Sequence, residues 1–260
     1  MKLLVSPAKS LNYESPLPHA HYSQPVFVKE AAALNMALRK KSPAELKALM
    51  GISDKLAELN WTRNQSFTTP FTSDNARPAV YAFDGDVYTG LDAYTIDEEK
   101  WDTLNNSLRI LSGLYGVLKP FDLMQPYRLE MGTFFSVNGS KNLYGFWQEK
   151  ITAQLNSELQ SDELVVNLAS KEYASAVSLA DLDASVIEPI FKDYKNGNLK
   201  IISFYSKKAR GLMARYLIDN NSKTSEDVLG FDIDGYRYSE EHTVDTTKPV
   251  FVRSVLYRIC

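Results

Sequence analysis

Short apolar runs alternate with stretches of helical spacing along this chain, a pattern typical of an α/β protein. The apolar runs at residues 2–6, 108–111 and 164–168 predict buried strands, because a continuous apolar run bounded by turn formers fits a strand covered on both faces. The spacing of Ala, Leu and aromatic residues predicts helices over residues 26–41 and 143–159. We therefore expect a β-sheet with helices around it.

The rest of the chain adds shorter elements and shows no domain boundary. A helix is expected at residues 97–105, and turn residues indicate hairpins near Asn196-Gly197 and Asp234-Gly235. Further strands are expected at residues 79–83, 185–191, 199–204 and 249–256. No repeat, low-complexity stretch or linker interrupts the chain. We expect residues 1–260 to form a single compact α/β domain with a mixed β-sheet and surrounding helices.

Two helices joined by a tight turn are expected at about residues 43–63. Ser42 and Pro43 suit the N-cap and first turn of the first helix. The turn sequence Leu49-Met-Gly-Ile-Ser-Asp-Lys-Leu-Ala57 resembles the helix-hairpin-helix pattern Leu-x-Gly-Ile-Gly-x-x-x-Ala. In that motif, backbone amides at the start of the second helix hold a DNA phosphate, as helix N-termini generally hold anions.

The resemblance to this motif makes Gly51, Ser53 and Lys55 candidates for DNA binding. Two residues depart from the pattern. Ser53 replaces the second glycine, and Asp54 places a negative charge where the phosphate would lie. Asp54 also suits an ordinary helix start, because a carboxylate is favourable near the helix N-terminus. An ordinary helical hairpin is therefore the alternative.

Polar side chains follow the predicted strands at their carboxyl ends. Residues 111–132 hold turn formers that no regular element tolerates, yet they also carry charged and aromatic groups. Loops that leave a strand and carry such groups are where sites are usually built. The polar side chains expected at these strand ends are Lys9, Arg128, Glu130, Ser170, Glu172 and Tyr173. The alternatives are a solvated Lys9 and a tight loop in which Arg128 pairs with Glu130.

A basic helix is expected after residue 205, with Ser206 as its N-cap. Lys207, Lys208, Arg210 and Arg215 fall on the arc opposite the apolar residues, and no acidic residue occurs between positions 203 and 218. Cations in a first helical turn oppose the helix dipole unless an anion lies nearby. The basic face therefore predicts a phosphate or carboxylate ligand, with a solvated surface as the alternative.

Composition limits the kinds of partner. A formal net charge of −3 argues against a protein coated in basic residues, so a polyanion site must be a local patch. With one cysteine, Cys260, and three histidines, we expect no disulfide framework, no metal site and no cofactor. We also expect no signal peptide and no membrane span, hence a cytoplasmic protein.

Several blocks, in order and nearly end to end, resemble the YaaA family of bacterial peroxide-stress proteins. They include Ser6-Pro-Ala-Lys9, residues 49–57, residues 85–90, Leu111-Ser-Gly-Leu-Tyr-Gly116, residues 125–132, Asn167-Leu-Ala-Ser170 and residues 204–213. The resemblance implies a cytoplasmic protein induced by hydrogen peroxide that keeps unincorporated iron low and limits oxidative damage to DNA and protein. It also implies a compact α/β fold with a helix-hairpin-helix element and a basic cleft that binds DNA. It supplies no catalytic residues.

Two functions follow as hypotheses. In the first, the chain binds double-stranded DNA along Lys207, Lys208, Arg210 and Arg215 and at the hairpin, with weak sequence specificity and strong salt dependence. Direct iron sequestration is a poor fit, because the sequence lacks clustered Cys and His.

In the second hypothesis, the chain is an enzyme that acts on a small anionic substrate such as a nucleotide or nucleobase derivative. Lys9, Arg128 and the basic helix would hold the anion, and Glu130 or Glu172 would serve as the base.

Overall fold

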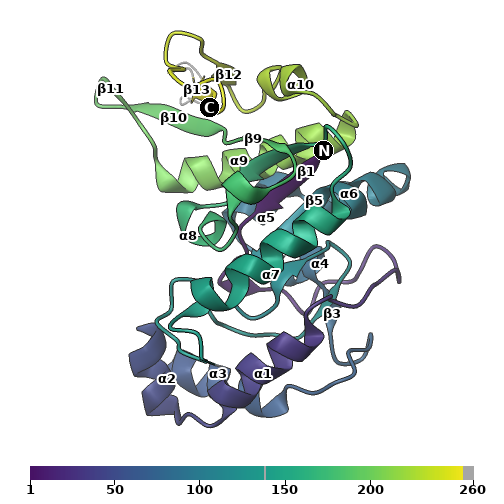
Figure 1. The fold of residues 1–260 in the computed structure, drawn as a ribbon, viewed down its shortest axis with the longest axis vertical. Helices are drawn as coiled ribbons and strands as arrows, with labels where there is room; N and C mark the ends of the chain where they lie inside the picture. Colours follow the sequence, from purple (N-terminus) through teal and green to yellow (C-terminus); the bar gives the residue numbers. More distant parts are fainter. Residues whose placement is uncertain (138, 254–260) are drawn as a thin grey trace.

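The structure, a computed structural model, describes residues 1–137 and 139–253 and is organised around a five-stranded sheet (Figure 1). Its strands are β1 (Lys2–Val5), β5 (Leu108–Ser112), β6 (Gly116–Leu118), β8 (Leu164–Leu168) and β9 (Ser185–Ile187). Their order is β6-β5-β1-β8-β9, with β6 antiparallel to β5 and the other neighbours parallel. The three buried strands predicted from the apolar runs are confirmed, and they form the centre of this sheet.

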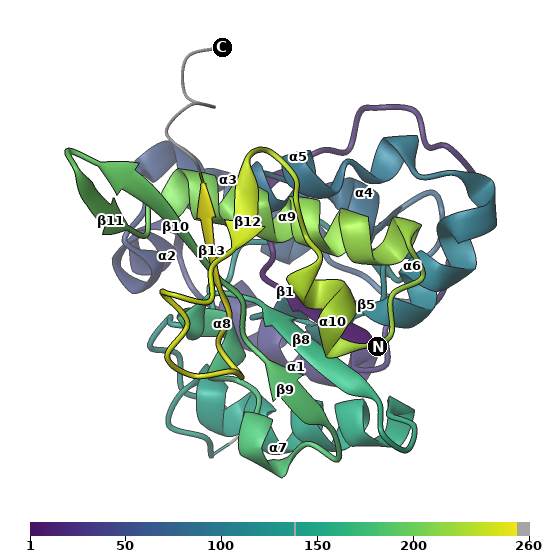
Figure 2. The same ribbon diagram turned by 90° about the horizontal axis from the view of Figure 1, so that it is seen from above.

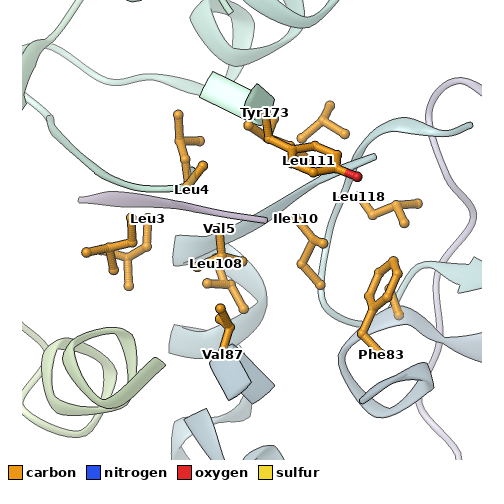
Figure 3. Packing of buried hydrophobic residues seen from close by; sticks show 14 of the residues in the cluster. Leu3, Leu4, Val5, Phe83, Val87, Leu108, Ile110, Leu111, Leu118 and Tyr173 are labelled. Carbon is orange, nitrogen blue, oxygen red and sulfur yellow. The ribbon is translucent and has the colours of Figure 1, made fainter. Parts of the chain in front are cut away.

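The central strand β1 is covered on both faces, as its continuous apolar run requires. Leu3 and Val5 point to one side of the strand, toward Val87, whereas Leu4 points to the other side, where Tyr173 lies (Figure 3). All three β1 side chains are almost fully buried. Side chains therefore alternate across the strand and join both halves of the core.

Helices cover both faces of the sheet (Figure 2). The helix α7 (Leu143–Glu158) lies on one face, and α5 (Asp86–Leu91) and α9 (Ser203–Asp219) lie on the other. The prediction of an α/β fold with a mixed sheet and surrounding helices is confirmed. The predicted helix at residues 143–159 matches α7 to within one residue.

Helices α5 and α9 touch backbone to backbone at two glycines. A Cβ at Gly211 would lie 1.9 Å from the carbonyl oxygen of Val87, and one at Gly90 would lie 2.2 Å from that of Lys208. Only glycine permits so close an approach. This contact fixes the position of α9 relative to the sheet edge.

The connections of the sheet reverse direction at its centre. The chain leaves β1 toward β5 on one side, and it leaves β8 toward β9 on the other side. Because β1 and β8 are parallel neighbours, their adjacent carboxyl ends form a topological switch point. Open α/β sheets place their ligands at such a point.

A second sheet packs near α9. It contains β10 (Ile190–Lys195), β11 (Asn198–Lys200), β12 (Tyr236–Tyr238) and β13 (Val250–Arg253), in the order β11-β10-β13-β12. The predicted strand over residues 185–191 is wrong as one element, because it divides at Glu188-Pro189 between β9 and β10 of different sheets. Proline lacks the N–H that a continuous ladder needs.

One other expectation about an element is wrong, one extends past the described residues, and one helix was not expected. Residues 199–204 do not form one strand, since β11 ends at Lys200 and α9 begins at Ser203. The last predicted strand is β13, and positions 254–256 of that prediction lie outside the described residues. Residues 225–229 form a helix, α10 (Ser225–Leu229), that the pattern did not predict.

The strand expected at residues 79–83 is instead a helical turn, α4 (Ala79–Ala82), because a short apolar run buried all round fits either element. Two-residue strands flank it. They are β3 (Arg77–Pro78), paired with β7 (Leu123–Met124), and β4 (Phe83–Asp84), paired with β2 (Ser10–Leu11).

The predicted N-terminal helices form a separate layer at the bottom of Figure 1. They are α1 (Val28–Arg39), α2 (Pro43–Met50) and α3 (Asp54–Ser66). Ser42 caps α2 as predicted, and its hydroxyl accepts a hydrogen bond from the Glu45 amide. Two further short helices are α6 (Trp101–Ser107) and α8 (Lys171–Ala174). Over the described residues, no helix has the length and apolar character needed to cross a membrane.

Candidate functional site

A cleft of about 640 Å³ lies at the carboxyl ends of β1 and β8. We call it the strand-end cleft. One wall comes from residues 6–10 after β1 and from Ser170 to Tyr173 after β8. Residues 84–88, which adjoin this segment through the pairing of Ser10 with Asp84, and the first turns of α9 complete the lining. The cleft thus occupies the switch point of the sheet.

Glu130 joins two predicted site residues, Arg128 of its own loop (residues 111–132) and Lys9 of the loop after β1. The Glu130 carboxylate lies 2.7 Å from Nζ of Lys9 and 3.2 Å from Nη2 of Arg128. Arg128 therefore pairs with Glu130, as the simpler alternative proposed, and Glu130 also lines the cleft. Because two cations neutralise it, Glu130 is engaged in holding the loop.

Glu172 ties the same loop to the end of β8. Its Oε1 accepts a hydrogen bond of 2.9 Å from the backbone N–H of Gly132. Its second carboxylate oxygen has no hydrogen-bond partner among the residues that the structure describes. Of the two candidate bases, Glu172 is the one with an unused oxygen at the cleft.

Hydroxyl groups join the two strand ends. Ser6 Oγ accepts a 2.8 Å hydrogen bond from the Ser170 amide and donates to Ser170 Oγ at 3.3 Å. The Tyr88 hydroxyl donates to the Ser6 carbonyl oxygen at 3.1 Å. Burial raises the pKa of Tyr88 and that of Tyr173, so both phenols stay protonated and act as neutral groups.

The basic helix starts earlier than the sequence predicts. Helix α9 begins at Ser203 with Ile202 in the N-cap position, so Ser206 is not the cap. Ser206 is buried inside the first turns and lines the cleft. Lys207 and Lys208 therefore lie beyond the first turn, and the argument that they oppose the helix dipole is wrong. Their position within the helix carries no information about an anion.

Arg210 is the cation of α9 that the fold leaves unsatisfied. Its Nε is buried without a hydrogen-bond partner, and no acceptor contacts the rest of its guanidinium in the described part of the chain. Burial lowers the pKa of the Arg210 guanidinium, because desolvation disfavours the charged form. Lys207 is exposed on the same wall of the cleft.

The other two cations of the predicted basic face have structural partners. Arg215 bonds to Asp219 at 2.7 Å and to Thr95 Oγ1 at 2.8 Å, which ties α9 to the segment after α5. Lys208 lies 3.7 Å from Asp234. Neither residue lines the strand-end cleft. The four cations do not form one continuous surface.

The α2–α3 turn lies apart from the cleft, and none of its residues lines it. Gly51 ends α2 in the left-handed conformation, with φ of 60°. Ser53 caps α3, and Lys55 is exposed in the first turn of that helix. Asp54 forms an ion pair of 2.9 Å with Lys47. These observations fit both a helix-hairpin-helix motif and an ordinary hairpin, so that motif stays a prediction.

Two further carboxylates of the site, Asp84 and Asp86, come from an Asp-Gly-Asp turn that the sequence predicts. They flank Gly85 where β4 passes into α5, and both line the cleft. The Asp-Gly-Asp sequence marks a turn, but a turn signal gives no indication of what the turn faces. No group of three or more His, Cys, Asp or Glu residues is arranged to hold a metal ion in the described ranges.

Comparisons with known proteins match nearly the whole chain. A family model described as "Peroxide stress protein YaaA" matches residues 1–242. A UPF0246 protein of Flavobacterium johnsoniae is 60% identical over 238 residues, which cover 92% of this chain and 94% of the relative. A UPF0246 protein of Alteromonas mediterranea is 52% identical over 256 residues, which cover 98% of each chain. This chain belongs to the YaaA family of peroxide-stress proteins.

Proposed function

We propose that this chain serves its peroxide-stress role by binding a phosphate group of its ligand in the strand-end cleft. The observation that supports this proposal is Arg210, whose buried Nε has no partner among the described residues and whose guanidinium lines the cleft. A buried donor without a hydrogen-bond partner is unfavourable. A guanidinium binds phosphate well, because its planar fork offers parallel N–H donors.

A small phosphorylated molecule is the source of phosphate that the shape of the cleft favours. The volume of about 640 Å³ lies within the usual range for small-molecule sites, and the position at a switch point is where α/β sheets bind such ligands. If the chain is an enzyme, Arg210 holds the anion and Glu172 is the better base, because Glu130 is already paired with two cations.

Double-stranded DNA is the second source, and the α2–α3 turn favours it. The turn and the N-terminal end of α9 both lie toward the left of Figures 1 and 2, with the turn at the bottom of Figure 1 and α9 in its upper half. A duplex would place one phosphate near Ser53 and Lys55 and another near Lys207. Such contacts read the backbone, so binding would have weak sequence specificity.

We also propose that any lowering of free iron, and the protection of DNA and protein in the cytoplasm that follows, acts indirectly through this ligand. The full sequence holds three histidines and one cysteine. Iron storage by this chain would need more clustered ligands than that.

An Arg210→Gln variant tests the proposal, with Lys195→Gln at the exposed end of β10 as the control. For inorganic phosphate measured by calorimetry, Arg210→Gln should weaken binding by about 10- to 100-fold, the usual effect of a lost hydrogen bond to a charged group. For a DNA duplex, the slope of log affinity against log salt should shrink by about 0.9 if Arg210 meets a backbone phosphate. Unchanged binding of both ligands in Arg210→Gln would contradict the proposal.

A further inference from the structure

A second cavity, of about 480 Å³, lies beside the strand-end cleft. Its walls come from Asn167 and Ala169 at the end of β8, from residues 174–179, and from Glu188 to Ile190 between the two sheets. Lys248 completes it. Lys171 and Arg210 line both cavities, so these two cations stand at the boundary between them.

The two cavities differ in charge. Around the second cavity, Lys171, Arg210 and Lys248 face a single acid, Glu188. Glu188 is already engaged, because Asn167 Nδ2 donates to it at 2.8 Å and Lys248 lies 3.9 Å away. An anion is therefore stabilised at the boundary and on the side of the second cavity.

The strand-end cleft itself has no excess of positive charge. Four basic residues, Lys9, Lys171, Lys207 and Arg210, are matched there by Asp84, Asp86, Glu130 and Glu172. Asp84 and Asp86 accept no side-chain hydrogen bond within the described residues, and Glu172 has one unused oxygen. Ionised carboxylates only accept hydrogen bonds, so this end of the site suits a ligand rich in hydroxyl or amino donors.

We propose that the two cavities form one site for a phosphorylated polyol, such as a nucleoside monophosphate. Its phosphate lies at the boundary on Lys171 and Arg210, with Lys248 on the far side. Its sugar hydroxyls lie in the strand-end cleft and donate to Asp86 and Glu172. This assignment rests on the proposed function, since it names the ligand whose phosphate Arg210 binds.

Calorimetry on the full chain tests the assignment with three probes: adenosine 5′-monophosphate, ribose 5-phosphate and adenosine. We expect the two phosphorylated probes to bind and adenosine to bind more weakly. Lys248→Gln should weaken both phosphorylated probes by about tenfold, because it removes one charge-assisted contact. It should leave adenosine unchanged. Asp86→Asn should weaken adenosine 5′-monophosphate and adenosine alike, and Lys195→Gln should change nothing.

Each part of the assignment can fail by itself. If Lys248→Gln binds the phosphorylated probes like the wild type while Arg210→Gln does not, the phosphate lies wholly in the strand-end cleft and the second cavity is not part of the site. If the wild type binds inorganic phosphate as tightly as it binds adenosine 5′-monophosphate and ribose 5-phosphate, the polyol assignment is wrong and the proposed function stands. If Arg210→Gln binds every phosphate probe like the wild type, both are wrong. Thermal unfolding of each variant shows whether it is folded.

Discussion

Replacing Arg210 with methionine should stabilise the ligand-free protein. The Nε of Arg210 is buried, and the guanidinium has no acceptor in the part of the chain that the structure describes. An unsatisfied buried donor costs about 1–3 kcal/mol. Methionine fills much of the same volume, keeps helix propensity and adds no unpaired group. For a protein of this size, about 2–4 °C in Tm corresponds to 1 kcal/mol, so we expect a rise of roughly 3–9 °C.

Thermal denaturation followed by circular dichroism, in a buffer free of phosphate and sulfate, measures this difference. Lys207→Met is the matched control, because Lys207 lies one turn away on the same wall but is exposed. Its Tm should stay close to the wild-type value. Adding excess ribose 5-phosphate should raise the Tm of the wild type and not that of Arg210→Met. A lower Tm for Arg210→Met than for the wild type would show that Arg210 has a structural role, and it would refute the reasoning.

Three further predictions concern the scaffold and the α2–α3 turn. Gly211→Ala should lower the free energy of unfolding in urea by about 1–3 kcal/mol, because the new Cβ would lie 1.9 Å from the Val87 carbonyl oxygen. Gly145→Ala is the control, since a Cβ at that position meets only Asn142 Oδ1 at 3.7 Å. Burial raises the pKa of Asp122 from 3.8 to about 6, so the folded state retains a proton that the unfolded state releases. Stability should therefore fall, by about 2 kcal/mol, as the pH rises from about 4 to about 6, and Asp122→Asn should flatten that dependence. Ser53→Asp keeps an N-cap but adds a negative charge, so it should weaken DNA binding more than Ser53→Asn does if the turn holds a phosphate.

Each of these has a result that would contradict it. Equal urea midpoints for Gly211→Ala and Gly145→Ala would mean that α5 and α9 separate easily. A stability that rises between pH 4 and pH 6 with the same slope in Asp122→Asn would mean that other groups dominate. Equal DNA affinity for the Ser53→Asp and Ser53→Asn variants would leave the turn an ordinary helical hairpin.

The sequence predicted the elements whose pattern is set by burial. The strands β1, β5 and β8 are buried on both faces, which requires continuous apolar runs, and α7 follows its amphipathic spacing. The start of α9 was not predictable, because no capping side chain marks it and the preceding Ile201 and Ile202 are equally typical of a strand. Only tertiary contacts, such as that of Gly211 with α5, fix where this helix lies.

The sequence predicted the residues of the site that follow parallel strands, but it did not predict which cation of α9 belongs to the site. Polar residues after parallel strands must meet at one sheet edge, so Lys9, Ser170 and Glu172 were expected to converge, and all three line the cleft. The helix projection treated Arg210 and Arg215 alike, because they share an arc of α9. It contains no information on the neighbouring elements, which give Arg215 a partner in Thr95 and leave Arg210 with no partner among the described residues.

A crystal structure of the protein with ribose 5-phosphate would locate the phosphate site. We expect density for the phosphate at the boundary of the two cavities, with its oxygens within hydrogen-bond distance of the Arg210 guanidinium and the Lys171 ammonium. A phosphate bound elsewhere, with the Arg210 guanidinium paired to a carboxylate of the protein itself, would contradict it.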